Sequence, residues 1–161
     1  MITIRTLSPA DRDDAVRVID AAARWYEEFL PPEEVPEPEM TPQQWSDEAE
    51  RMTWYGAFEH RRLVGVIGLE DAGDAALLRH WYVDPAHQRR GIGSRLRRHL
   101  EEEAGPATRI IAGTYAANHK ARTALERAGY ELSADTEAVL RAYYDIPEER
   151  LASSVTYELV R

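Results

Sequence analysis

A glycine-rich turn between an apolar strand and an amphipathic helix constrains this chain more than any other stretch. The turn reads Gln88-Arg89-Arg90-Gly91-Ile92-Gly93-Ser94. Residues 75–83 before it are typical of a strand, and apolar residues recur at helical spacing after it. A helix that begins in such a turn presents unpaired backbone N–H groups and the positive end of its dipole, and glycine lets a ligand come close. The turn is therefore suited to a phosphate or diphosphate.

The spacing in this turn differs from the two common nucleotide-binding motifs. It is Gln-x-x-Gly-x-Gly after Tyr82-Val83-Asp84-Pro85, and neither GxxxxGK[ST] nor GxGxxG is present. The next elements in order are an amphipathic helix, a short strand, Asn118 and a helix that ends in Gly129-Tyr130. This ordered set resembles the GNAT acyltransferase family, and the resemblance covers nearly the whole chain. The alternative is an ordinary strand-to-helix turn whose arginines are solvated.

Local patterns along the rest of the chain predict alternating strands and helices. The expected strands cover residues 2–7, 54–59, 62–69, 75–83, 109–113, 130–132 and 155–159. Expected helices begin at Ser8, Thr41, Ile92, Asn118 and Asp135, and a last turn covers 148–151. The helix from Thr41 is expected to reach about Met52, and strands 54–59 and 62–69 are expected to form a hairpin that turns near His60-Arg61. Gly105-Pro106 ends the helix that follows the glycine turn. The order of elements indicates an α/β fold with mixed strand directions. It is also the order of the GNAT fold, which implies a mixed central sheet of six to seven strands flanked by about four helices.

The length of 161 residues and the lack of a long linker indicate one domain, residues 1–161. The resemblance implies that its cosubstrate is acetyl-CoA. The diphosphate would meet the N–H groups of Arg90 to Ser94. The pantetheine arm would pair with the strand backbone at Trp81 and Val83, in a V between strands 75–83 and 109–113. The residues expected to bind the cofactor are Trp81, Val83, Gln88, Arg89, Arg90, Gly91, Ile92, Gly93, Ser94 and Asn118.

The resemblance further implies an N-acetyltransferase (EC 2.3.1 class) that acylates a primary amine of a small cationic molecule or a protein. Such a reaction needs a neutral amine, a donor for the developing oxyanion and a proton for the leaving thiolate. The family's usual proton donor is a Tyr four residues before the glycine that ends the Asn118 helix, and here that position is Leu125. We favour Tyr143 and Tyr144 as replacements because they precede an Ile-Pro break near the sheet edge where the family places the acceptor. Tyr115 and Tyr157 are further candidates, and each tyrosine also fits a packing role.

Two side chains are candidate bases. His80 lies on the strand that leads into the glycine turn, and its imidazole titrates near neutral pH. Alternation places His80 on one face of that strand and Arg79 with Trp81 on the other. Glu70, at the end of the preceding strand, is a rival base that would act through water. A structural histidine bonded to the backbone is the other interpretation of His80.

The net charge of −9 falls in one segment. Residues 25–50 hold nine acidic side chains and no Lys or Arg, and the rest of the chain holds 20 acidic and 20 basic ones. Carboxylates beside aromatic rings suit a cation. We therefore expect Trp25, Glu27 and Glu28 to help bind a cationic acceptor, with a solvated acidic loop as the alternative. The charge balance disfavours nucleic acid as a partner.

Several classes of site are excluded or disfavoured by what the sequence lacks. It has no cysteine, so disulfides, thiolate metal sites and a cysteine nucleophile are excluded. No histidine or carboxylate spacing suits a metal, and no apolar run of about 18 residues suits a membrane span. The beginning of the sequence is typical of a strand and not of a signal peptide. We expect a cytoplasmic protein without a metal, whose partner is a small-molecule or protein amine, and a homodimer stays open.

Two other functions compete with the enzyme. A catalytically weak acyl-CoA-binding sensor with the same fold is favoured by Leu125. A nucleic-acid binder would use the arginines between residues 89 and 98, and its binding would depend strongly on salt.

Overall fold

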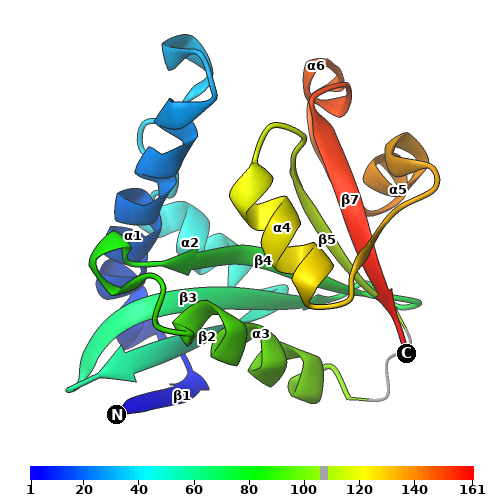
Figure 1. Ribbon diagram of the computed structural model, residues 1–161. Helices are drawn as coiled ribbons and strands as arrows, with labels where there is room; N and C mark the ends of the chain where they lie inside the picture. Colours follow the sequence, from blue (N-terminus) through cyan, green and yellow to red (C-terminus); the bar gives the residue numbers. More distant parts are fainter. Residues whose placement is uncertain (106–108) are drawn as a thin grey trace. The chain divides into compact units, whose positions relative to one another are not determined.

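The computed structural model describes residues 1–105 and 109–161, and it has the mixed α/β architecture that the sequence predicts (Figure 1). Its strands are β1 (Ile2–Thr6), β2 (Met52–Glu59), β3 (Arg62–Asp71), β4 (Ala76–Val83), β5 (Arg109–Tyr115), β6 (Glu131–Leu132) and β7 (Ser154–Val160). Its α-helices are α1 (Arg12–Ala22), α2 (Pro42–Glu48), α3 (Ile92–Glu103), α4 (His119–Arg127), α5 (Thr136–Tyr143) and α6 (Glu148–Leu151).

The strands form one mixed sheet in the order β1-β2-β3-β4-β5-β7-β6. The pair β4–β5 is parallel, whereas β1–β2, β2–β3, β5–β7 and β6–β7 are antiparallel. A parallel pair needs a long crossover, which α3 provides between β4 and β5. The prediction of a mixed central sheet of six to seven strands is thus confirmed, with seven strands observed. The described residues form six α-helices and not about four, since α5 and the single turn α6 precede the last strand.

The chain divides into two compact units. Unit 1 contains residues 1–71 and 79–105, and unit 2 contains residues 72–78 together with the described residues from 109 to 161. Strand β4 runs through both, because Ala76–Leu78 belongs to unit 2 and Arg79–Val83 to unit 1. That residues 1–161 form a single domain stays a prediction.

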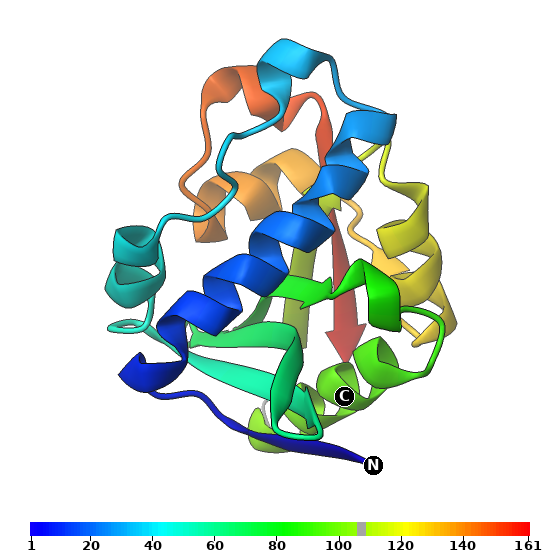
Figure 2. The ribbon, with the colours of Figure 1, turned by 90° about the vertical axis from the view of Figure 1, so that its left-hand side faces the viewer.

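Unit 1 has a core between its strands and helix α1, which crosses in front of the β2–β3 hairpin in Figure 2. The buried apolar stripe of α1 includes Ala15 and Ile19, as its spacing predicts. Trp45 of α2 and Trp54 of β2 complete this core. The helix expected from Ser8 consists of a 3-10 turn, α1 and a 3-10 stretch over Ala23–Glu28.

One predicted boundary in unit 1 matches the structure and another does not. The hairpin turns at His60 and Arg61, whose positive φ angles of 50° and 67° suit a tight turn, so the predicted position is confirmed. Helix α2 ends at Glu48 and β2 already begins at Met52, so the helix expected to reach Met52 was predicted too long.

Unit 2 has its own core, formed by Ala75, Leu77, Ile111 and Val139, with Tyr143 and Tyr144 packed against it. Helix α4 ends before Gly129, which has a φ of 93°, as its pattern predicts. Pro106, expected to help end α3, lies outside the described residues. Within the part of the chain that the structure describes, no helix has the length and apolarity needed to cross a membrane.

Candidate active site

The glycine turn is held in place by hydrogen bonds at the end of β4. The backbone N–H of Asp84 donates to the Val64 carbonyl at 2.8 Å, and the Asp84 carboxylate accepts from the Ala86 N–H at 3.0 Å. The Gln88 side chain donates to the carbonyl of Val83 at 3.0 Å. The Gln88 amide, expected to bind the cofactor, therefore fixes the shape of the turn.

Gly91 gives α3 an N-terminus that suits an anion. It is the N-cap residue with a φ of 79°, and no side chain caps the helix there. The first intrahelical bond runs from the Arg95 N–H to the Gly91 carbonyl at 3.1 Å, so the N–H groups of the first turn have no partner within the helix. A Cβ on Gly91 would meet no described atom within 4 Å. The backbone here is thus accessible, and a positive φ favours glycine.

Gly93 has a different role from Gly91. A Cβ at this position would lie 3.5 Å from Nε1 of Trp81 and 3.6 Å from Cγ2 of Val83. The Trp81 indole also donates to the Gly93 carbonyl at 3.0 Å. A Cβ here would only be in ordinary van der Waals contact with β4, so packing alone does not require glycine at this position. Ile92, which is buried, anchors the same turn in the core.

The arginines of the turn are not all available to a ligand. Arg90 forms a two-bonded ion pair with Glu59 of β2, and its hydrogen bonds hold the pKa of Glu59 below its usual range. Arg89 is exposed and has a φ of 65°, and Ser94 is exposed in the first turn of α3. Because Glu59 neutralises Arg90, the attraction of an anion to this turn comes from the backbone N–H groups and from Arg89.

A buried carboxylate joins the two candidate bases. Glu48 is 9% exposed, and its Oε1 lies 2.7 Å from Nε2 of His80 and 3.0 Å from Nη2 of Arg79. Arg79 also donates to Glu70 at 2.8 Å. The prediction that alternation separates Arg79 from His80 was wrong, because His80 has a φ of 52° and the regular pleat is broken there.

The charge of Glu48 is stabilised by its neighbours. Burial acts to raise the pKa of Glu48, but the hydrogen bond with His80 and the charges of His80, Arg79 and Arg51 outweigh it and lower the pKa. Glu48 is therefore ionised at neutral pH. No pattern in the sequence indicates this role, because Glu48 is one of nine acidic residues in the segment 25–50.

The residues expected to bind the acceptor share one 3-10 stretch, Ala23–Glu28. The Trp25 ring packs edge-on against Phe29, with centroids 5.7 Å apart. Glu27 pairs with Arg24 at 3.2 Å, and Glu28 is exposed. Arg24 lies just outside the acidic segment and neutralises part of its charge.

A second polar cluster in unit 1 was missed at the sequence level. The hydroxyls of Tyr26 and Tyr82 lie 2.8 Å apart, and Tyr82 donates to Glu39 at 3.2 Å. Burial, followed by the charges of Tyr26 and Glu39, raises the pKa of Tyr82 well above its ordinary value. The sequence places Tyr82 in strand β4 between Trp81 and Val83, and this alternation is the sequence feature that could have drawn attention to its side chain.

Asn118 in unit 2 caps α4 as predicted. Its side-chain oxygen accepts from the Ala121 N–H at 3.2 Å, and its amide donates to Thr114 at 3.2 Å. Leu125, at the position of the family's usual tyrosine, is 2% exposed and belongs to the core. This helix therefore offers no phenol at that position.

The two adjacent tyrosines of unit 2 have different surroundings. The Tyr143 hydroxyl donates to Asp74 at 2.8 Å and accepts from Arg109 at 3.0 Å. The hydrogen bond with Asp74, more than any other contact, raises the pKa of Tyr143. Tyr144 lies against β5, with its Cζ 3.4 Å from the position of a Cβ on Gly113. Tyr143 is thus held in a polar network, whereas Tyr144 packs on a strand.

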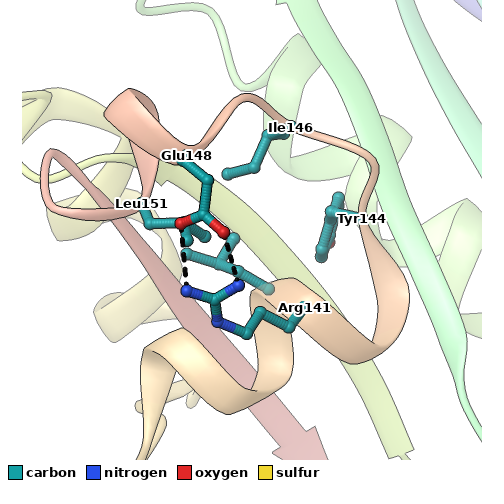
Figure 3. Close-up of a pocket in the computed structure, with 6 residues that line it drawn as sticks. Arg141, Tyr144, Ile146, Glu148 and Leu151 are labelled. Carbon is teal, nitrogen blue, oxygen red and sulfur yellow. Dashed lines mark hydrogen bonds and ion pairs between the residues drawn. The ribbon is translucent and has the colours of Figure 1, made fainter.

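Tyr144 also lines a cavity of about 210 Å³ (Figure 3). The other lining residues come from α5, α6 and the segment between them: Leu140, Arg141, Ile146, Glu148 and Leu151. Arg141 is paired with Glu148 at 2.8 Å and with Glu137 at 3.0 Å, so its charge is neutralised.

The remaining candidate tyrosines are bound to arginines. Arg150 donates to the Tyr115 hydroxyl at 2.5 Å. Arg122 donates to the Tyr157 hydroxyl at 2.8 Å, and Tyr157 donates to Glu126 at 3.0 Å. Among the residues that the structure describes, no group of three or more His, Asp or Glu side chains is arranged to hold a metal ion.

Comparison with known proteins supplies a family match and structural neighbours. The family model described as "Acetyltransferase (GNAT) family" matches residues 19–130. No curated protein matches the sequence significantly. The fold is similar to that of the PaiA N-acetyltransferase from Thermoplasma acidophilum in complex with coenzyme A, with a TM-score of 0.79, 18% identity, and coverage of 100% of this chain and 99% of that one.

Two further solved structures share the fold. The ribosomal-protein-S18-alanine N-acetyltransferase from Escherichia coli has a TM-score of 0.73 and 19% identity, and covers 99% of this chain and 94% of its own. An acetyltransferase from Streptococcus agalactiae 2603 has a TM-score of 0.74 and 16% identity, with coverage of 99% and 98%.

Proposed function

This chain belongs to the acetyltransferase (GNAT) family, and we propose that it transfers an acetyl group from acetyl-CoA to a primary amine of a small cationic molecule or a protein. The observation that carries the proposal is the N-terminus of α3. Its first turn lacks a side-chain cap and begins at a glycine with a positive φ and no neighbouring atom in the direction of a Cβ.

This turn fits the diphosphate of coenzyme A. The N–H groups from Arg90 to Ser94 would bind the phosphate oxygens, and the helix dipole would favour their negative charge. The pantetheine arm would pair with the backbone at Trp81 and Val83. The assignment of Asn118 to the cofactor rests on the family resemblance. A structural neighbour crystallised with coenzyme A is consistent with this cosubstrate.

The reaction needs a base and an acid from this chain. The protonated amine first loses one proton to His80, or to a water held by Glu70, and the neutral nitrogen then attacks the acetyl carbon. The carbon–sulfur bond then breaks, and the thiolate takes a proton. We assign that donation to Tyr144, because its side chain lines the cavity described above. The second proton, which the nitrogen loses as the amide forms, replaces through solvent the one that the thiolate takes.

The acceptor is proposed to be a cation that binds the 3-10 stretch with Trp25, Glu27 and Glu28. Carboxylates attract a protonated amine, and an aromatic face adds a cation–π contact. The name of one structural neighbour, a ribosomal-protein alanine N-acetyltransferase, keeps a protein amine among the candidates. We further propose that the protein acts in the cytoplasm, without a metal.

The alternative is a sensor that binds acyl-CoA without turnover, which the buried Leu125 favours. A thiol-release assay with acetyl-CoA separates the two functions. The acceptors to be tested are simple primary amines, polyamines, aminoglycosides, amino acids and peptides with free N-termini. If the chain is an acetyltransferase, we expect thiol release that depends on one class of amine. Saturable binding of acetyl-CoA without release for any acceptor would favour the sensor.

A further inference from the structure

The cluster around Glu48 has a chemical consequence for the acetyl transfer proposed above. We propose that Glu48 is a positioning residue that holds His80 with its proton on Nε2, so that Nδ1 takes the proton of the attacking amine. This inference rests on the proposed function for its last step. The position of the proton on His80 follows from the structure of unit 1 alone.

Two contacts fix the imidazole ring. Its Nε2 lies 2.7 Å from Oε1 of Glu48, and its face stacks on Trp54 with centroids 5.2 Å apart and an angle of 28° between the planes. Trp54 in turn stacks on Trp45, with centroids 5.4 Å apart. The ring is thus held on one face and at one nitrogen, although the His80 side chain keeps 17% of its surface exposed.

The tautomer follows from the charge of the carboxylate. An ionised carboxylate can only accept hydrogen bonds, and Oε1 of Glu48 also forms an ion pair with Nη2 of Arg79 at 3.0 Å. The hydrogen in the contact with His80 must therefore sit on Nε2. In a neutral imidazole with Nε2–H, the lone pair lies on Nδ1, which is then the basic atom.

The groups facing His80 favour its action as a base. Glu48 contacts His80 directly, Arg79 and Arg51 contact Glu48, and Glu70 contacts Arg79, so these four charged groups form one cluster with the imidazole. Two carboxylates and two guanidiniums balance, so a neutral His80 leaves the cluster without net charge. When Nδ1 takes a proton, the adjacent carboxylate stabilises the imidazolium. That proton passes to solvent when the product leaves.

The backbone at His80 supports a functional position. Its φ of 52° is unusual for a residue with a side chain and persists only where surrounding contacts hold it. His80 directly precedes Trp81, whose backbone is proposed to pair with pantetheine. The strained residue and the proposed cofactor strand are therefore contiguous.

The first test is the tautomer of His80 in the unmodified protein. Long-range ¹H–¹⁵N correlation spectra distinguish the two neutral tautomers, and a His80→Gln variant assigns the signal. We expect Nε2–H at a pH where the ring is neutral, and a dominant Nδ1–H form would overturn the proposal. This readout does not require turnover. A protein with the expected tautomer but no acetyl transfer would contradict the proposed function instead.

The second test is the Glu48→Gln variant, with the exposed Glu149→Gln as the matched control for lost charge. Removing the carboxylate should release the fixed Nε2–H tautomer of His80, so that both neutral tautomers appear in the spectra and kcat falls at least about tenfold. The KM for acetyl-CoA should stay within about twofold, and the control should behave as the parent. A Glu48→Gln variant with the parent kcat and the parent His80 tautomer would overturn the role of Glu48.

Discussion

At the scale of single residues, neighbours of the same type differ through their contacts. Tyr143 and Tyr144 are equivalent in the sequence, but only the Tyr143 hydroxyl has both a charged donor and a charged acceptor. Gly91 and Gly93 are likewise distinguished by the direction of the missing Cβ, which is open at Gly91 and faces Trp81 at Gly93. Spacing alone could not separate the members of either pair.

The two tyrosines lead to a paired prediction. Replacing Tyr144 by Phe should lower kcat about 10²-fold, the usual scale for a lost general acid, and leave stability nearly unchanged. Replacing Tyr143 by Phe should leave kcat nearly unchanged and lower stability only slightly, because Asp74 and Arg109 lose a shared partner at a solvent-accessible position. Steady-state kinetics and urea unfolding measure the two effects. Parent turnover in both variants would mean that the thiolate takes its proton from elsewhere, most simply from solvent.

At the scale of elements, caps and turns were predictable and broken regularity was not. Thr41, Asn118 and Asp135 cap their helices as their residue types suggest. The hairpin turn at His60 also followed from local signals. The left-handed backbone at His80 did not, because it depends on tertiary contacts to Glu48 and Trp54 that no local pattern reveals.

The cap of α4 gives a prediction at this scale. Asn118→Ala should cost about 1 kcal/mol of unfolding free energy, since the Ala121 N–H loses its acceptor. Asn118→Asp keeps an acceptor oxygen and should recover most of that loss. Urea unfolding measures both variants. Equal stability of the alanine variant and the parent would show that the cap contributes nothing.

At the scale of the whole molecule, the distribution of charge was predictable but the pairing of charges was not. The sequence places the net charge in residues 25–50. The structure shows that Arg24, just before this segment, pairs with Glu27 and Glu37, and that Glu48 is buried among cations. The acidic segment is therefore less negative in space than its composition indicates.

The charge of this segment leads to a prediction about salt. The KM for a cationic amine should rise with ionic strength, because exposed charges are screened over about 8–10 Å, while the KM for acetyl-CoA should change less. Glu27→Gln combined with Glu28→Gln should raise the amine KM and leave kcat nearly unchanged, the pattern of lost ground-state binding. Glu102→Gln with Glu103→Gln removes equal charge elsewhere and should have no such effect. An unchanged amine KM in the Glu27→Gln, Glu28→Gln variant would show that the acidic segment is only a solvated surface and does not bind the acceptor.

Acid stability gives a second prediction for the whole molecule. The Arg109 hydrogen bond, assisted by Ser133 and opposed by burial, lowers the pKa of Glu158. A carboxyl with a lowered folded pKa stabilises the fold above its unfolded pKa of about 4.3, and this contribution is lost as pH falls through the folded pKa. Glu158→Gln should therefore reduce stability at pH 7 and flatten its fall below about pH 5. Urea unfolding across pH checks this, and an unchanged pH dependence would contradict it.

The most direct test of the proposed acetyl-CoA site is calorimetric binding to the parent and to Gly91→Val. Valine should remove the positive φ and obstruct the backbone, and so weaken binding at least tenfold, about 1.4 kcal/mol. Gly73→Val is the matched control, because Gly73 also has a positive φ, 88°, and open space around its Cβ position. The expected result is tight binding in the parent and the control, and weak binding in Gly91→Val. Unchanged affinity in a folded Gly91→Val variant, or no binding to the parent, would contradict the assignment of this turn to acetyl-CoA.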